Sequence, residues 1–222
     1  MRVPNEITHS HVLEYIRGIV PCKEEIYSEV ERVCLEEDVP MVDQEVKSLI
    51  GFLLTIRPPE RILEIGTAYG FSSIYMSRFL KPGGTILTIE RHDVMWKEAE
   101  KYIEKAGLTE VIDLRKGQAA EILPALQQPY DFILLDASAA QYSDFYEEAK
   151  RLLKPGGMIL ADNVLHGGMV AKERLEIPRR QRTIHARMRD FLYEALRDPE
   201  LVTSLQPIGD GVLLAFKQEK EV

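Results

Sequence analysis

The chain has few features of a secreted, membrane-bound or disulfide-bonded protein. It contains only two cysteines, Cys22 and Cys34, whose spacing matches neither a metal knuckle nor a redox pair, so we interpret both as ordinary thiols. No apolar run approaches the ~20 residues that a transmembrane helix needs. The first residues also lack the charged-then-apolar layout of a signal peptide. We therefore expect a cytoplasmic protein.

Net positive charge is lacking as well. The chain has 36 acidic and 28 basic residues and a net charge of −8, which disfavours nucleic acid as a partner of the molecule as a whole. One stretch, from Lys172 to Arg189, has the opposite balance, because its only acids are Glu173 and Glu176. Its basic residues are Lys172, Arg174, Arg179, Arg180, Arg182, Arg187 and Arg189.

The first part of the chain has the apolar spacing of helices. Val12, Ile16 and Ile19 recur at helical intervals, and a similar pattern begins at Ile26. A third helix is predicted from about Asp43, a suitable N-cap, to Thr55, before two prolines. Residues 1–56 are therefore predicted to be a helical extension within one domain that spans residues 1–222.

Beyond residue 60, short apolar runs alternate with amphipathic segments. This alternation predicts an α/β, Rossmann-like fold with helices on both faces of a mostly parallel sheet. The last two strands, joined by a short loop at 207–210, suggest an antiparallel edge pair. The seven predicted strands are 61–65, 85–89, 111–114, 131–135, 158–161, 202–206 and 211–216. The main helices between them are predicted to end near residues 80, 106, 126, 153 and 197, with turn residues at 154–157.

Polar residues and glycines follow strand after strand, where open α/β sheets bind ligands. Gly66 opens a tight turn that ends at Gly70, and Glu90 closes the second strand. Ala68 stands where a dinucleotide fingerprint needs its middle glycine, which favours a ligand without phosphates over NAD. Glu90 is placed to accept hydrogen bonds from ribose hydroxyls.

Oxygen-bearing side chains follow the fourth and fifth strands. Asp136, Asp162 and Asn163 offer two carboxylates and an amide, the donor set of a hard cation such as Mg²⁺ or Ca²⁺. All three follow neighbouring strands and could converge on one ion. The alternative is an Asp-Asn turn next to an unrelated aspartate, and spacing alone does not decide between these readings.

These motifs resemble the cation-dependent class of O-methyltransferases that includes catechol and caffeoyl-CoA methyltransferases. The resemblance spans roughly residues 36 to 216 and implies S-adenosylmethionine (SAM) as cofactor and a divalent cation such as Mg²⁺. It favours the metal-binding interpretation of the oxygen-bearing trio. The matching pieces are 63–72, 88–91, 131–137, 153–157, 162–165 and 207–211.

The resemblance also implies roles for individual residues. Asp136, Asp162 and Asn163 correspond to the metal ligands, and Asp136 with Asp210 to the catalytic positions beside the acceptor. Family members often carry a lysine, proposed as the general base, where this chain has Ala139. The implied SAM contacts are Val42, Gly66, Ser72, Glu90, Gly117, Gln118, Ala119 and Asp136.

Within this class the chain is similar to enzymes that methylate 5-hydroxyuridine at the wobble position of bacterial tRNA. The similar features are 39–40, 162–165, 168–171, 178–182 and 209–211. This similarity implies that part of the basic stretch holds tRNA phosphates, which need Arg and Lys. The alternative is a solvated helix face. The implied tRNA contacts are Lys172, Arg174, Arg179, Arg180 and Arg182.

Other functions stay open at this point. The overall acidity favours a methyltransferase of small catechol-like or phenolic acceptors. The absent lysine allows a SAM-binding module without catalysis, although the complete metal trio disfavours it. A nicotinamide dehydrogenase is a more distant alternative. The apolar, helical N-terminus makes a homodimer an expectation.

Overall fold

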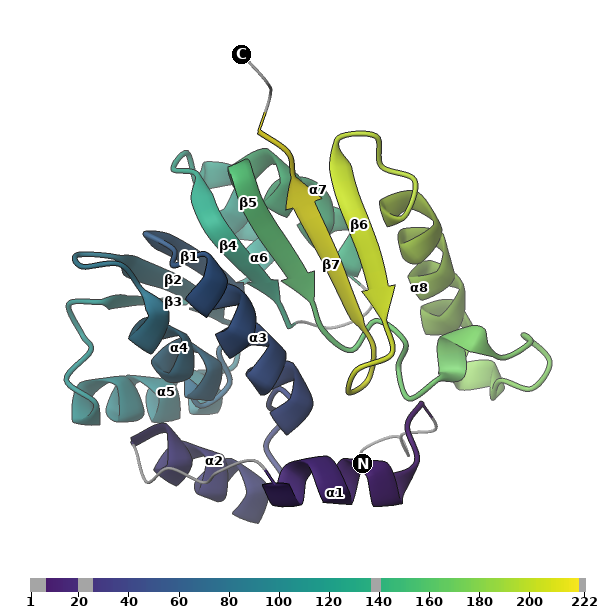
Figure 1. Cartoon of the computed structure of the whole chain (residues 1–222), viewed down its shortest axis with the longest axis horizontal. Helices are drawn as coiled ribbons and strands as arrows, with labels where there is room; N and C mark the ends of the chain where they lie inside the picture. Colours follow the sequence, from purple (N-terminus) through teal and green to yellow (C-terminus); the bar gives the residue numbers. More distant parts are fainter. Residues whose placement is uncertain (1–6, 20–25, 137–140, 220–222) are drawn as a thin grey trace.

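The computed structural model describes residues 7–19, 26–136 and 141–219. Its centre is a seven-stranded sheet in the order β3-β2-β1-β4-β5-β7-β6 (Figure 1). Neighbouring strands are parallel except that β7 is antiparallel to both β5 and β6. The strands are β1 Arg61–Ile65, β2 Thr85–Glu90, β3 Ile112–Lys116, β4 Tyr130–Leu135, β5 Leu153–Ala161, β6 Leu201–Gln206 and β7 Val212–Lys217.

The predicted fold class is therefore confirmed, with one refinement at the sheet edge. The two closing strands do pair antiparallel. The reversed strand is β7, which lies one place in from the edge, and β6 forms the edge itself. No helix in the described ranges is long and apolar enough to span a membrane.

Helices cover both faces of the sheet because successive strand residues point to opposite sides. On β1, Ile62 packs with the cluster that holds α3 and α4, whereas Leu63 packs with the cluster of α7 and α8. Figure 1 shows α3 and α4 in front of the sheet and α6 and α7 behind it. The covering helices are α3 Gln44–Ile56, α4 Phe71–Met76, α5 Asp93–Lys105, α6 Ala119–Ile122, α7 Tyr142–Leu152 and α8 Arg182–Ala195.

The N-terminal extension contributes two more helices, α1 Ser10–Ile19 and α2 Ile26–Glu36, on the side of the sheet where the β4 and β5 arrows end (Figure 1). Helix α1 buries no residue, whereas α2 buries Val30 and Cys34. Burial raises the pKa of the Cys34 thiol to about 11, and it forms no disulfide, as expected of an ordinary thiol. Cys22 lies outside the described residues.

Several predicted boundaries were wrong. The helix predicted to end near residue 80 is α-helical only as far as Met76 and continues as the 3₁₀ turn η1, Ser77–Phe79. The strand predicted at 111–114 runs from Ile112 to Lys116. Strand β5 begins at Leu153, which pairs with Tyr130, and not at Met158; a register irregularity in this pairing accommodates the residues that were predicted to form a turn. The helix predicted to reach residue 126 is α-helical only as far as Ile122. It then tightens into the 3₁₀ turn η2, Leu123–Ala125, at Pro124, whose nitrogen has no hydrogen to donate.

Burial in the core predicts different losses of stability when side chains are truncated on a central strand and on an edge strand. Ile133 is fully buried on central strand β4, so Ile133→Ala should lower the free energy of unfolding by about 2–5 kcal/mol. Val202 is 53% exposed on edge strand β6, and Val202→Ala should cost less than about 1 kcal/mol. Urea unfolding at pH 7 measures both variants. Equal losses would contradict the placement of β4 at the centre.

Candidate active site

The parallel register gathers the predicted site residues at one edge of the sheet. After each of four strands, the next residue donates its backbone N–H to a carbonyl at the end of the neighbouring strand, so the ladder continues one step past the strands. The four bonds are Gly66 to Ile89 (3.0 Å), Gly117 to Glu90 (2.9 Å), Asp136 to Ile65 (3.0 Å) and Asp162 to Leu135 (2.9 Å).

The turn from Gly66 to Gly70 is held by Glu90. Ala68, with φ 47°, adopts a left-handed conformation that costs a non-glycine residue about 1 kcal/mol. Its N–H donates to Glu90 Oε2 at 2.9 Å, and the N–H of His92 donates to Oε1 at 2.8 Å. Two backbone donors thus orient a buried carboxylate whose oxygens keep lone pairs for ligand hydroxyls.

The other predicted cofactor contacts lie in loops or first helical turns near the strand ends. Val42 is buried just before Asp43, the N-cap residue of α3, and Ser72 is buried in the first turn of α4. Gln118 is the N-cap residue of α6, which starts at the buried Ala119. Gly117 has φ 148°, a conformation that few other residues adopt. Their contacts with a cofactor stay predictions.

A buried carboxyl that the sequence analysis missed lies beneath the turn. Glu64, in the middle of β1, is fully buried. Its Oε2 accepts hydrogen bonds from Thr88 (2.6 Å) and Ser73, and its Oε1 has no partner in the described part of the chain. Burial raises the pKa of Glu64 to about 7. The signal that could have revealed Glu64 was an acid between the apolar residues Leu63 and Ile65 of a predicted strand.

The predicted metal ligands do meet. Asn163 donates from its side-chain amide to Asp136 Oδ1 (3.0 Å) and from its backbone N–H to Asp162 Oδ1 (2.8 Å). Burial raises the pKa of Asp136 to about 6 and that of Asp162 well above its ordinary value, with the Asp136 charge as the second cause for Asp162. Within the described residues, neither carboxylate forms an ion pair.

These observations fit a cation, because a positive ion would remove the mutual repulsion of two desolvated carboxylates. The side-chain amide of Asn163 is needed as the third ligand beside the two carboxylates. Across residues 7–19, 26–136 and 141–219, no group of three or more His, Cys, Asp or Glu side chains could hold a metal by itself. Ala139 lies outside the described residues.

The charges of two further aspartates, Asp43 and Asp210, act on this cluster. The predicted Asp210 lies in the β6–β7 loop, which is fastened to the segment after Asn163 because Leu165 N–H donates to the Asp210 carbonyl at 2.9 Å. Its charge contributes to the raised pKa of Asp162. Asp43, which we predicted only as a helix cap, makes no side-chain cap bond, and its charge raises the pKa of both Asp136 and Asp162.

Known proteins match the chain over most of its length. A family model described as O-methyltransferase covers residues 21–218. A catechol O-methyltransferase from Niastella koreensis is 40% identical over 118 residues, which are 51% of this chain and 53% of that protein. This chain thus spans about half of that relative. A caffeoyl-CoA O-methyltransferase from Populus kitakamiensis is 30% identical over 171 residues, which are 74% of this chain and 73% of the relative.

A solved structure agrees with these relatives. The O-methyltransferase TomG from Streptomyces achromogenes, crystallised in complex with SAM, superposes with a TM-score of 0.81 at 27% identity. The superposition covers 94% of this chain and 96% of TomG. The chain belongs to the O-methyltransferase family. Its reaction class is SAM-dependent O-methyl transfer, as the motif resemblance implied.

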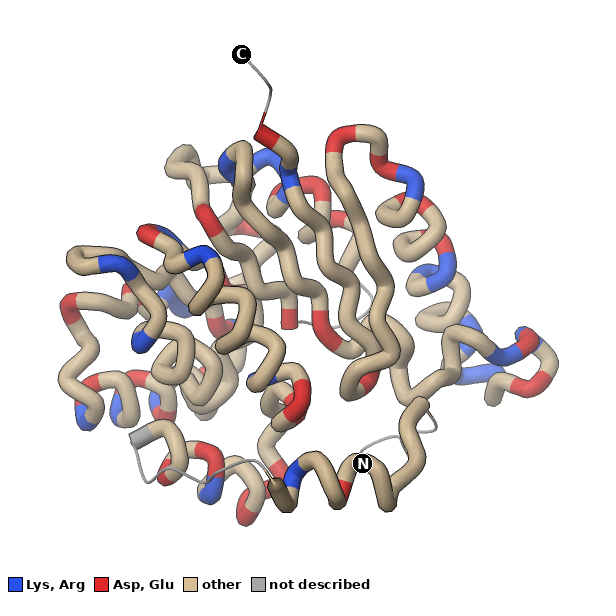
Figure 2. The backbone as a smooth tube through the Cα atoms, viewed as in Figure 1, with Lys and Arg blue, Asp and Glu red and all other residues tan. Residues whose placement is uncertain are grey.

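The basic stretch of this methyltransferase forms a projecting lobe. In Figure 2 its Lys and Arg positions lie beside the start of α8, with acidic residues at the tip. The stretch follows the 3₁₀ turn η4, Met169–Ala171, contains the 3₁₀ turn η5, Arg179–Gln181, and continues into the first half of α8. Arg174, Arg179 and Arg180 are exposed and form no salt bridge within the described residues. Arg182 donates to the Ile177 carbonyl at 2.9 Å.

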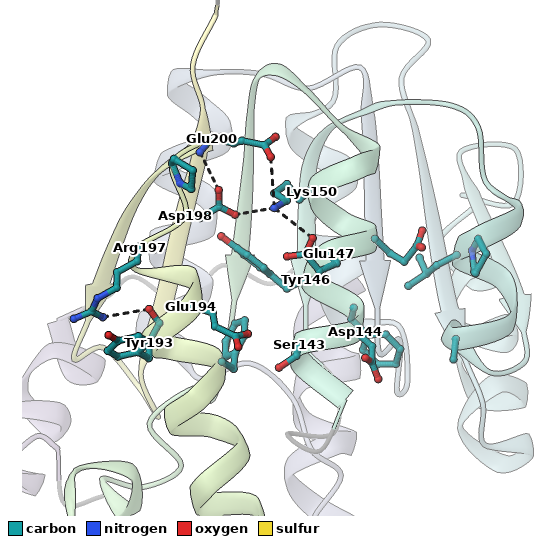
Figure 3. A pocket seen from close by; sticks show the side chains of 17 residues that line it. Ser143, Asp144, Tyr146, Glu147, Lys150, Tyr193, Glu194, Arg197, Asp198 and Glu200 are labelled. Carbon is teal, nitrogen blue, oxygen red and sulfur yellow. Dashed lines mark hydrogen bonds and ion pairs between the residues drawn. The ribbon is translucent and has the colours of Figure 1, made fainter.

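A cavity of about 840 Å³ lies elsewhere in the methyltransferase, along α7 and α8 (Figure 3). Its central lysine, Lys150, already contacts Asp198 (3.0 Å), Glu147 (3.3 Å) and Glu200 (3.8 Å). The ion pairs with Asp198 and Glu200 fasten the α8–β6 connection to α7, whereas Glu147 lies on α7 itself. The lining shares no residue with the predicted site at the strand ends, so we assign this network to stability.

The buried Glu64 predicts a pH dependence of stability. Its folded-state pKa is raised from 4.5 to about 7, so the folded chain holds this proton more tightly than the unfolded chain. The stabilisation is full below pH 4.5 and is lost as the pH rises through about 7. Glu64→Gln should remove this pH dependence, a change of about 3 kcal/mol. Urea unfolding at pH 5 and pH 8 measures it, and an unchanged difference in the variant would contradict the assignment.

Proposed function

We propose that this methyltransferase transfers the methyl group of SAM to the 5-hydroxyl of 5-hydroxyuridine at the tRNA wobble position, giving 5-methoxyuridine. The observation that carries the choice of tRNA is the basic lobe. It follows in sequence from Asn163, and the exposed Arg174, Arg179 and Arg180 lack acidic partners among the described residues. Exposed guanidinium groups near a site suit a phosphate backbone regardless of its sequence.

The cofactor half of the proposal rests on the glycine turn and Glu90. The turn carries backbone N–H groups and no large side chain at Gly66 or Ala68, so a ligand can approach the main chain closely. Glu90 is buried and oriented by two backbone donors, and its free lone pairs suit the hydroxyls of a ribose. Binding both substrates in fixed positions lowers the entropic barrier to transfer, by up to ~7–11 kcal/mol in well-aligned reactions.

Asp136, Asp162 and Asn163 would hold the cation, for which Mg²⁺ suits an all-oxygen set. When bound, a cation there would favour the ionised form of an acceptor hydroxyl. A 5-hydroxyuracil ring offers two adjacent oxygens, its 5-hydroxyl and 4-carbonyl, as catechol does. Its enol-like hydroxyl should lose a proton more readily than a simple phenol, which reduces the need for a lysine at position 139. Asp210 lies beside this cluster to face the acceptor.

A small catechol-like or phenolic acceptor is the second candidate. The 40% identical relative is a catechol O-methyltransferase, and the net charge of −8 opposes nucleic acid at long range. Methyl transfer from labelled SAM to tRNA that contains 5-hydroxyuridine, run beside catechol with and without Mg²⁺, separates the two. Methylation of catechol alone would overturn the tRNA proposal. The homodimer also stays a prediction, which light scattering would test through the molar mass in solution.

Removal of a metal ligand should abolish the response to metal. We expect chelation to reduce wild-type activity and Mg²⁺ to restore it, whereas Asp162→Ala should lose at least about 100-fold in kcat and show no response, since metal assistance is worth several kcal/mol. Asp113→Ala, at an exposed position of β3, is the control. Unchanged turnover by chelator-treated Asp162→Ala would show that the cation has no role.

Removal of lobe charges should weaken tRNA binding and its salt dependence. Arg179→Gln with Arg180→Gln should reduce the slope of log K against log[salt] by about 1.4–1.8, at about 0.7–0.9 for each of two phosphate contacts. Turnover of catechol by this variant should stay unchanged. Lys101→Gln on α5, where the side chain is exposed and paired with Glu98, is the control. An unchanged slope in filter binding across 50–200 mM salt would place the tRNA elsewhere.

A further inference from the structure

Among the described residues, one hydrogen bond joins the N-terminal extension to the cofactor turn at residues 66–70. Glu37, the first residue after α2, accepts from the hydroxyl of Tyr69 at 2.8 Å through its Oε2. Tyr69 is only 7% exposed, and its ring stacks on Tyr102 with the centroids 6.5 Å apart. The backbone N–H of Glu37 donates to the Val33 carbonyl at 2.9 Å, which continues the hydrogen bonding of α2. Both partners are therefore anchored in packed structure.

Tyr69 directly follows the most constrained residue of the turn. Ala68 is left-handed, and its own N–H is bound by Glu90 from the β2 side. Two carboxylates from separate elements thus hold consecutive residues, one through the backbone and one through a side chain. The bond to Glu37 raises the pKa of Tyr69 to about 12, because the neutral phenol is the form that donates to the carboxylate.

The segment that connects α2 to α3 contributes another predicted contact of the cofactor site. From Glu37 the chain passes through Asp38, with φ 54°, and the buried Val39, whose N–H donates to the Cys34 carbonyl at 2.8 Å. It then reaches Val42, a predicted SAM contact that is 3% exposed. Glu37 therefore links the start of the α2–α3 connection to the turn at residues 66–70. The predicted cofactor site uses both segments.

We propose that Glu37 is a positioning residue for SAM binding, which acts through Tyr69 to hold the 66–70 turn in its binding conformation. Loss of the bond lets the strained turn relax, and SAM must then restore it on binding. The cost falls on SAM affinity and on the KM for SAM, not on kcat at saturation. The proposal rests on SAM binding by this family member and is independent of the acceptor.

A purely structural role is the competing explanation, and the chain offers a matched control. Lys105 of α5 binds Glu29 of α2 at 2.6 Å, a second tether between α2 and the domain. No residue of this second pair belongs to the turn. Glu29→Ala should therefore loosen α2 without affecting SAM, which separates attachment of the helix from positioning of the turn.

The experiment is a double-mutant cycle with Tyr69→Phe, Glu37→Ala and the combination, read by calorimetric Kd for SAM without acceptor. Each single change should weaken SAM about fivefold, the value of one hydrogen bond, with kcat at saturating SAM nearly unchanged. The combination should be no weaker than either single variant. Glu37→Gln should recover most of the affinity because its amide oxygen still accepts, and Glu29→Ala should leave the Kd unchanged.

Three results would overturn the proposal: an unchanged Kd in every variant with only the Tm lowered, fully additive losses, or an equal loss in Glu29→Ala. Tyr69→Phe keeps the ring packing, so it reports on the bond even if Glu37→Ala fails to fold. Absence of SAM binding in the wild type would instead overturn the cofactor assignment itself. Normal wild-type binding without any effect of these variants overturns only the role of Glu37.

Discussion

The parallel pairing of β1 with both β2 and β4 determines where the polar residues of the site lie. In register, Ile65 stands opposite Ile89 on one side and Leu135 on the other, so the residues after these strands emerge at one edge. The ladder continues one hydrogen bond beyond β1, β3, β4 and β5, which gives the residues after these strands fixed backbone positions before any ligand binds. A slip of one residue would exchange the two faces of β1 and bring Glu64 away from Thr88.

That geometry places carboxylates where water cannot reach them. Glu64 and Asp162 are almost completely buried, and the pKa of each is raised by that burial. The surroundings of the two carboxyl groups differ in charge. Burial favours the neutral form of Glu64 within the core, and the hydroxyls of Thr88 and Ser73, which donate to its Oε2, offset only part of that effect. Asp162 instead faces the charges of Asp136, Asp43 and Asp210, an arrangement that favours a cation.

Local patterns predicted what depends on neighbours in sequence, and missed what depends on packing. The apolar run at 131–135 identified β4, and its following aspartate could be placed at the sheet edge. Leu153 was missed because the turn signal after it conceals its pairing with Tyr130 across the sheet. Asp43 was predicted as a cap, because only the packing of α3 brings its charge near Asp162. The link from Glu37 to Tyr69 joins residues 32 apart and leaves no local pattern.

Charge distribution connects the site with the choice of acceptor. The molecule as a whole repels a polyanion, but charges more than about 8 Å apart are largely screened at physiological salt. A docked phosphate therefore responds mainly to the nearest side chains. On the lobe those include the exposed Arg174, Arg179 and Arg180, whereas on α5 two of the lysines, Lys101 and Lys105, are already paired with Glu98 and Glu29. An acidic protein can hold tRNA under these conditions only through a surface like the lobe, whereas an uncharged phenol would gain nothing from it.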